Sequence, residues 1–174
     1  GSTSYDKTLV AVIGSWRKVW KEDFPFYFVQ IAPNKTGSNN FWNAIVRDAQ
    51  RRVLKEVSNT GMVVISDVSD VKEIHPTDKV TVGIRLANLA LANTYKTNTD
   101  LVHSPLYKAI KIEGNRVIVS FDYADGLYFK GKTEQQFEIA GIDGVFYPAS
   151  AEINDNEVWL ESKKGIIPVK VRFA

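Results

Sequence analysis

Two short apolar runs constrain the fold of this 174-residue chain more than any other feature. Residues 24–31 and residues 61–66 are apolar almost without interruption, so neither run alternates in polarity as a half-exposed strand does. Such runs are typical of strands in a parallel sheet that is covered by helices on both faces. Gln30, the polar residue near the end of the first run, must find hydrogen-bond partners. We expect these partners to be either a neighbouring loop or backbone groups.

Segments in which apolar residues have the spacing of a helix lie before, between and after the two runs. Apolar residues recur every three or four positions over about 6–21, 42–57 and 80–95, which predicts three helices. Asn39 or Asn40 is expected to cap the second helix. The order helix–strand–helix–strand–helix predicts two parallel strands that are joined by a crossover helix.

The spacing also predicts which helix faces are buried. Trp16 and Trp20 of the first helix are expected to be packing residues rather than a platform for a ligand. The third helix is expected to bury one apolar face, formed by Val80, Ile84, Leu86, Ala87, Ala90 and Leu91.

Two parallel strands alone would leave an open sheet edge and a largely uncovered face. Residues 1–97 are therefore expected to be the back half of a larger doubly wound parallel α/β sheet, whose front strands lie outside this chain. Such a chain is expected to pair with the N-terminal part of its parent protein, to self-associate through the open edge, or to be ordered only in part.

The composition changes near residue 94, and the period of the apolar residues becomes two. Residues 98–174 are therefore expected to form a small antiparallel, sandwich-like β module with a hairpin turn at Gly114-Asn115. Its strands are expected near 110–112, 117–121, 137–140, 145–147, 149–153, 158–160 and 169–173. Exposed aromatic residues on one β face, for which Tyr123, Tyr128 or Tyr147 are candidates, would favour a non-catalytic carbohydrate- or partner-binding module over simple packing.

Composition excludes several classes of function. The net charge is only +2 and no basic tract stands out, so nucleic acid is not expected as a partner, and no membrane partner is expected either. No apolar run approaches the ~20 residues of a membrane span. The absence of cysteine excludes disulfides and zinc-thiolate sites and leaves the compartment open. The two histidines, His75 and His103, are too few for a histidine-rich metal site.

The clearest candidate for chemistry is the loop after the second run. It carries three acidic residues, Asp67, Asp70 and Glu73, and then His75. Ligands of open α/β sheets bind outside the carboxyl ends of the strands, and a histidine with carboxylates in reach can act as a general base. The alternative is that His75-Pro76 only starts the third helix, with the acids solvated near the positive end of that helix.

Several motifs, in the same order along nearly the whole chain, resemble the sialate O-acetylesterase family of serine esterases, which belongs to the SGNH hydrolase class. The most specific motif is residues 74–87, which begin Ile74-His75-Pro76-Thr77-Asp78. The other matching segments are residues 16–17, 23–30, 47–50, 59–62, 105–108, 137–141 and 148–151. The family usually has Asp-Ile-His-Pro where this chain has Glu73-Ile74-His75-Pro76.

The resemblance implies an SGNH-hydrolase-like fold and the removal of O-acetyl groups from sialic acids by a Ser–His–acid mechanism. His75 would be the base, with Glu73, Asp70 or Asp67 as its acid partner. The nucleophilic serine and the oxyanion hole would lie in segments outside this chain, so the chain alone is expected to be inactive. No metal or organic cofactor is implied, and the family is compatible with a periplasmic or secreted location. The rival activity is the deacetylation of another acetylated glycan.

Overall fold

The computed structural model describes residues 4–34, 41–97, 102–132, 136–162 and 164–173. The chain divides into two compact units, Gly1–Ser104 and Pro105–Ala174, whereas the change of composition suggested a division at residues 97–98. The architecture is mixed α/β, with a small parallel sheet in the first unit and a curled antiparallel sheet in the second. No helix in the described ranges is both long enough and apolar enough to span a membrane.

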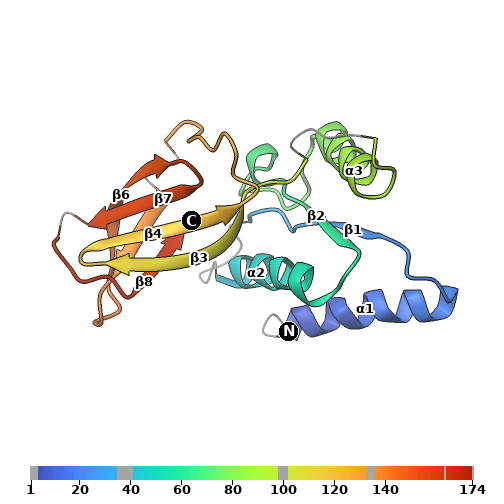
Figure 1. The fold of residues 1–174 in the computed structure, drawn as a ribbon, viewed down its shortest axis with the longest axis horizontal. Coiled ribbons are helices and arrows are strands. Elements are labelled where there is room, and N and C mark those ends of the chain that lie inside the picture. Colours follow the sequence, from blue (N-terminus) through green and yellow to red (C-terminus); the bar gives the residue numbers. More distant parts are fainter. Residues whose placement is uncertain (1–3, 35–40, 98–101, 133–135, 163, 174) are drawn as a thin grey trace. The chain divides into compact units, whose positions relative to one another are not determined.

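The first unit contains the predicted alternation of helices and strands (Figure 1). Its elements are α1 (Tyr5–Trp20), β1 (Phe26–Val29), α2 (Phe41–Glu56), β2 (Thr60–Val63), a 3-10 helix (Ser66–Val68) and α3 (Lys79–Asn93). The two strands are parallel, with Phe26 opposite Thr60 and Val29 opposite Val63. Both strands are shorter than the apolar runs that predicted them. The expected caps Asn39 and Asn40 lie outside the described residues.

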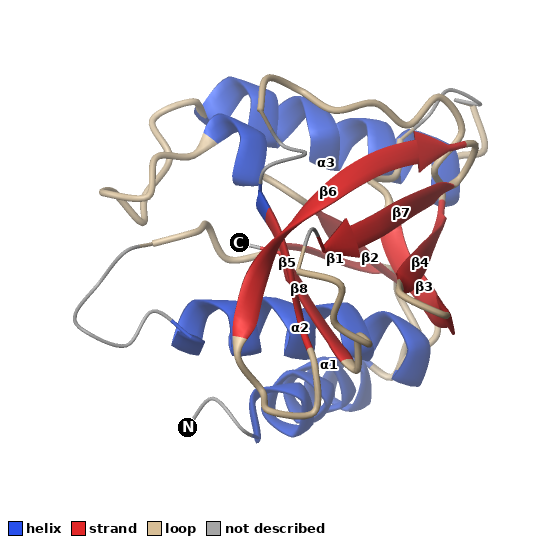
Figure 2. Cartoon of the chain, turned by 90° about the vertical axis from the view of Figure 1, so that its left-hand side faces the viewer, coloured by secondary structure: helices blue, strands red, loops and turns tan. Residues whose placement is uncertain are grey.

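Helices cover both faces of this small sheet, with α3 on one side and α1 and α2 on the other (Figure 2). On the α3 side, the Tyr27 hydroxyl is hydrogen-bonded to the Thr94 hydroxyl at 2.7 Å. On the opposite side, Phe26 meets the ring of Trp16 edge-on, with 6.4 Å between centroids. Gln30 donates from Nε2 to the Arg47 carbonyl on α2 at 3.1 Å. Gln30 therefore satisfies a backbone group, one of its two expected roles.

The prediction of which face of α3 is buried is wrong for Val80, Ile84 and Leu91. Val80 is 72% exposed, and Ile84 and Leu91 are exposed as well. The sheet instead packs against a stripe of α3 that contains Leu89, which is fully buried, together with Val82 and Leu86. Gly61 allows Leu89 to pack closely against the sheet. A Cβ at residue 61 would lie only 2.9 Å from the Leu89 side chain. The helix has two apolar stripes, and its periodicity alone did not distinguish them.

α1 is joined to the sheet and to α2 by polar contacts. Arg17 donates to the carbonyls of Phe24, Ser58 and Asn59, at 3.1, 3.1 and 2.8 Å, where both strands begin. Ile13 is buried, but Trp16 is largely exposed despite its contact with Phe26, and Trp20 is 70% exposed. The expectation that both tryptophans are packed is therefore wrong for Trp20 within the described part of the chain.

The second unit is one antiparallel sheet in the order β3-β4-β7-β6-β5-β8. Five of its strands are labelled in Figure 1, and β5 is labelled in Figure 2. Its strands are β3 (Leu106–Glu113), β4 (Arg116–Asp122), β5 (Phe137–Ala140), β6 (Phe146–Asn154), β7 (Glu157–Ser162) and β8 (Lys170–Phe173). Gly114 makes the predicted hairpin turn with a φ of +60°. The strands expected at 145–147 and 149–153 form the single strand β6. The core of this unit is formed mainly by side chains of β4, β5 and β7. They include Val117, Val119, Phe137, Ile139, Val158 and Leu160.

Tyr123, Tyr128 and Tyr147, three of the four tyrosines of this unit, do not share a β face. Tyr123 and Tyr128 are exposed in the segment that follows β4, whereas Tyr147 lies on β6. The Lys164 ammonium lies 5.6 Å from the centroid of the Tyr147 ring. These three tyrosines therefore do not form a single exposed aromatic surface.

Candidate active site

The loop between β2 and α3 is anchored to α3 at both of its ends. At its start, Arg85 of α3 donates from Nη1 to the Val64 carbonyl at 2.7 Å. At its end, the Asp78 carboxylate accepts from the Thr81 amide at 2.9 Å and from the Thr81 hydroxyl at 2.6 Å. These two bonds hold the pKa of Asp78 below its ordinary value. Because Asp78 is the N-cap, the alternative that Pro76 starts the helix is wrong.

Asp67, the first of the three acids, forms an ion pair with Arg85. The guanidinium binds both carboxylate oxygens, with Nη1–Oδ1 at 2.7 Å and Nη2–Oδ2 at 2.6 Å. This pairing raises the pKa of Arg85. A two-point contact of this kind fixes orientation as well as distance. Asp67 therefore ties the 3-10 helix to α3.

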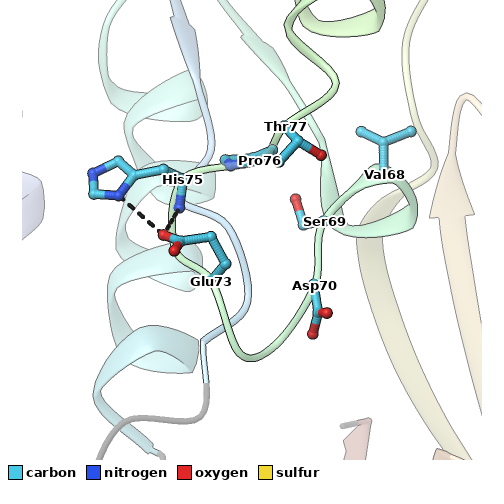
Figure 3. A pocket seen from close by; sticks show the side chains of 7 residues that line it. All are labelled: Val68, Ser69, Asp70, Glu73, His75, Pro76 and Thr77. Atoms are coloured by element: carbon cyan, nitrogen blue, oxygen red, sulfur yellow. Dashed lines mark hydrogen bonds and ion pairs between the residues drawn. The ribbon is translucent and has the colours of Figure 1, made fainter.

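Asp70, the second acid, closes the turn that precedes the histidine. Its Oδ1 accepts from the Lys72 backbone N–H at 2.9 Å, and its carbonyl accepts from the Glu73 N–H at 3.1 Å. A carboxylate that binds the backbone two residues onward is a standard way to stabilise a turn. The Asp70 side chain lies on the opposite limb of the loop from the His75 ring (Figure 3).

Glu73, the third acid, contacts His75 twice through one oxygen (Figure 3). Its Oε1 accepts from the His75 backbone N–H at 2.9 Å and lies 3.1 Å from the ring Nδ1. The backbone hydrogen bond is the largest cause of the lowered pKa of Glu73, and the ring contact is the next. A carboxylate accepts hydrogen bonds but does not donate them, so Nδ1 carries a proton in this arrangement. In the neutral form of the imidazole, Nε2 is the nitrogen that keeps a lone pair.

This histidine is open to solvent within the described chain. The side chain of His75 is 83% exposed and that of Glu73 is 57% exposed. An ion pair with such exposure contributes little to stability by itself. The ring is held by the turn and by Glu73, and it is accessible to a second group from outside the loop.

A cavity of about 200 Å³ lies beside the histidine. It is lined by Val68, Ser69, Asp70, Glu73, His75, Pro76 and Thr77 (Figure 3). The Ser69 hydroxyl donates to the Ile65 carbonyl at 2.6 Å, so this serine has a structural hydrogen bond. In the described ranges, no three acidic or histidine side chains gather as a metal site would require.

The comparison with solved structures gives a match over nearly the whole chain. The crystal structure of a carbohydrate acetylesterase from Xanthomonas citri superimposes with a TM-score of 0.88 at 32% sequence identity. The chain is similar to a carbohydrate esterase. The match covers 99% of this chain and 41% of that protein, so the chain spans less than half of its structural neighbour. No protein-family model matches the chain, and no curated protein is significantly similar to it.

Sequence reasoning missed the role of Arg85. The motif that contains it was recognised, but the arginine was not assigned to the acidic loop. Its signal was available in principle, because Arg85 lies in the second turn of α3, the helix that follows the three acids. His103, the other histidine, stands apart from the β2–α3 loop in the sequence, and burial lowers its pKa.

Proposed function

We propose that this chain carries the general base of an SGNH-type serine esterase that removes acetyl groups from carbohydrates. The observation that carries the proposal is the Glu73–His75 pair, which lies in the loop after the carboxyl end of a parallel strand. The similarity to a carbohydrate acetylesterase supports the class of reaction. The assignment of His75 as the base rests on the geometry of the loop and on the motif of residues 74–78.

In the proposed mechanism, a serine from polypeptide outside residues 1–174 attacks the acetyl carbonyl while His75 Nε2 accepts the serine proton. The Glu73 carboxylate accepts a hydrogen bond from Nδ1–H and stabilises the positive charge of the imidazolium. His75 then gives its proton to the sugar oxygen as the C–O bond breaks. In the second half-reaction His75 activates a water molecule, which releases acetate and regenerates the serine. The donors of the oxyanion hole come from outside this chain.

We propose O-acetylated sialic acids as the substrates. Support for this choice comes from the resemblance of residues 74–87 and of the segments around them to the sialate O-acetylesterase family. A second candidate is another acetylated glycan, because the neighbouring structure is described more broadly as a carbohydrate acetylesterase.

Acetate release by the intact parent protein tests the proposal. The panel would contain O-acetylated sialosides, acetylated xylan and acetylated chito-oligosaccharides at equal acetyl concentrations. The proposal expects the highest kcat/KM on the sialosides. A preference for xylan would support the second candidate, and no acetate release from any of these glycans would contradict both.

A further inference from the structure

Arg47 on α2 is a half-buried cation that the proposed mechanism does not use. Every other arginine of the chain forms an ion pair with an aspartate or a glutamate. Arg47 has no such partner among the residues that the structure describes. Burial lowers the pKa of its guanidinium, and no carboxylate of the described chain opposes that effect. A guanidinium that is partly removed from water needs a counter-charge, so Arg47 is suited to bind an anion.

Contacts along α2 show that Arg47 lies on the helix face that meets β1. Its carbonyl accepts from Gln30 Nε2 at 3.1 Å. Gln50, three residues later, donates from Nε2 to the Val29 carbonyl at 3.2 Å and accepts from the Ile31 amide at 2.9 Å. Residues three apart occupy the same face of a helix, so Arg47 shares the sheet-facing side with Gln50.

Arg47 also lies near the carboxyl end of β1. Nearer the start of α2, Asn43 donates from Nδ2 to the carbonyl of Asn34 at 3.1 Å. The helix therefore runs back along the segment that follows β1, from Asn34 at residue 43 to Val29 at residue 50. Arg47 is between these two points, where the chain has left the strand.

This end of β1 belongs to the same sheet edge as the loop of His75. β1 and β2 are parallel, so their carboxyl ends lie at one edge. Ala32, which follows β1, is buried in one cluster with Val63 and Ile65, which lead into the loop of His75. Ligands of parallel sheets bind at this edge. Arg47 and His75 are thus placed to contact one ligand.

An arginine at this position favours a carboxylate over other groups of a sugar. The planar guanidinium presents paired N–H donors that match the two oxygens of a carboxylate. Sialic acids carry a carboxylate at C1, separate from their acetylated hydroxyls. A residue that binds this carboxylate is therefore expected beside the loop of His75 and not within it. Neutral acetylated sugars offer no charge to pair with Arg47.

We propose that Arg47 binds the carboxylate of the acetylated sugar and makes the site selective for acidic over neutral substrates. The inference rests on the proposed function, because it assigns a substrate class to the same site. The competing partner is a carboxylate of the parent polypeptide outside residues 1–174. With that partner Arg47 would be a structural residue and would not influence the choice of substrate.

The test compares two substrates that differ only in this charge, an O-acetylated sialoside and the same sialoside with its carboxylate converted to a primary amide. Acetate release by the intact parent gives kcat/KM for both. The wild type should prefer the acid by at least about tenfold, because the amide cannot form the charge-assisted pair. Arg47→Gln should abolish the preference, chiefly by raising KM for the acid. Arg47→Lys keeps the charge without the paired donors and should retain part of the preference.

Arg52→Gln is the matched control, because it removes the same charge from the same helix. The guanidinium of Arg52 pairs with Asp6 and Asp48 instead. Its acid-to-amide ratio should stay within about twofold of the wild-type ratio. A wild-type ratio near one would overturn the inference. So would an Arg47→Gln variant that slows both substrates equally, or a change of the ratio in Arg52→Gln as large as in Arg47→Gln.

Calorimetry with the deacetylated sugar separates the inference from the proposed function. N-Acetylneuraminic acid should bind the wild-type parent at least about tenfold more tightly than its C1 amide, and Arg47→Gln should remove the difference. This result without acetate release from any sialoside would leave the inference standing and contradict the proposed function. Acetate release from sialosides together with equal binding of the two sugars, or binding of neither, would overturn the inference and leave the esterase assignment in place.

Discussion

The two terminal nitrogens of the Arg85 guanidinium, Nη1 and Nη2, bind the carboxylate of Asp67 at 2.7 and 2.6 Å, which commits this acid to α3 rather than to His75. Asp70 is committed to the backbone of Lys72, and only Glu73 contacts the imidazole among the acids of this loop. Three carboxylates that are equivalent in the sequence thus have three different roles in the structure.

The first prediction concerns the anchor of the loop. Arg85→Ala should lower the free energy of unfolding of the first unit by about 1–2 kcal/mol, because hydrogen bonds to both Asp67 and the Val64 carbonyl are lost. Chemical denaturation, followed through the amide signals of β2, measures this change. Lys55→Ala, which removes an exposed cation from α2 in the same unit, is the control and should change stability little. Equal effects of the two variants would show that the anchor contributes nothing.

The second prediction concerns the acid partner of His75. In the intact parent, Glu73→Gln should reduce kcat by more than about tenfold, because the neutral amide no longer stabilises the imidazolium. Asp70→Asn should have a smaller effect, since its amide oxygen can still accept from the Lys72 N–H. Steady-state kinetics on an acetylated sialoside compare the two variants. If Asp70→Asn proved the more damaging change, the acid role would move to Asp70.

The sequence predicted the order of helices and strands in the first unit because apolar periodicity and turn residues are local properties. It did not predict which stripe of α3 faces the sheet, since that choice depends on Gly61 leaving room for Leu89 across the fold. It left open whether Asp67, Asp70 or Glu73 contacts His75 for a similar reason. Arg85, which is distant in sequence and adjacent in space, binds Asp67, and the backbone of the turn decides between Asp70 and Glu73.

The third prediction is the titration of Glu73. Its folded-state pKa is lowered, so the contact with His75 is fully formed above the ordinary value of 4.5 and is lost only as the pH falls through the lower, folded value. A ¹³C NMR titration of the Glu73 carboxyl should give a midpoint below 4.5. In His75→Ala the midpoint should rise only in part, because the backbone N–H is the larger cause and remains. A wild-type midpoint at or above 4.5 would contradict the hydrogen-bonded geometry.

The fourth prediction concerns residues 1–174 as a separate polypeptide. Fluorophosphonates label serines that a neighbouring base has activated, and the Ser69 hydroxyl beside the cavity is instead bonded to the Ile65 carbonyl. We expect no labelled serine by mass spectrometry and no hydrolysis of acetyl esters above the buffer rate. Labelling of one serine that disappears in His75→Ala would show that the chain holds a complete active site.

The most direct test of the account is the turnover of the intact parent carrying His75→Ala, measured by acetate release from an O-acetylated sialoside. Loss of the base of a Ser–His–acid group typically reduces kcat by several orders of magnitude. Since the ring is 83% exposed, its removal should leave the melting temperature nearly unchanged. We therefore predict a folded protein whose kcat has fallen by at least a thousandfold. A folded variant that keeps more than about a tenth of the wild-type kcat would contradict the assignment of His75 as the base.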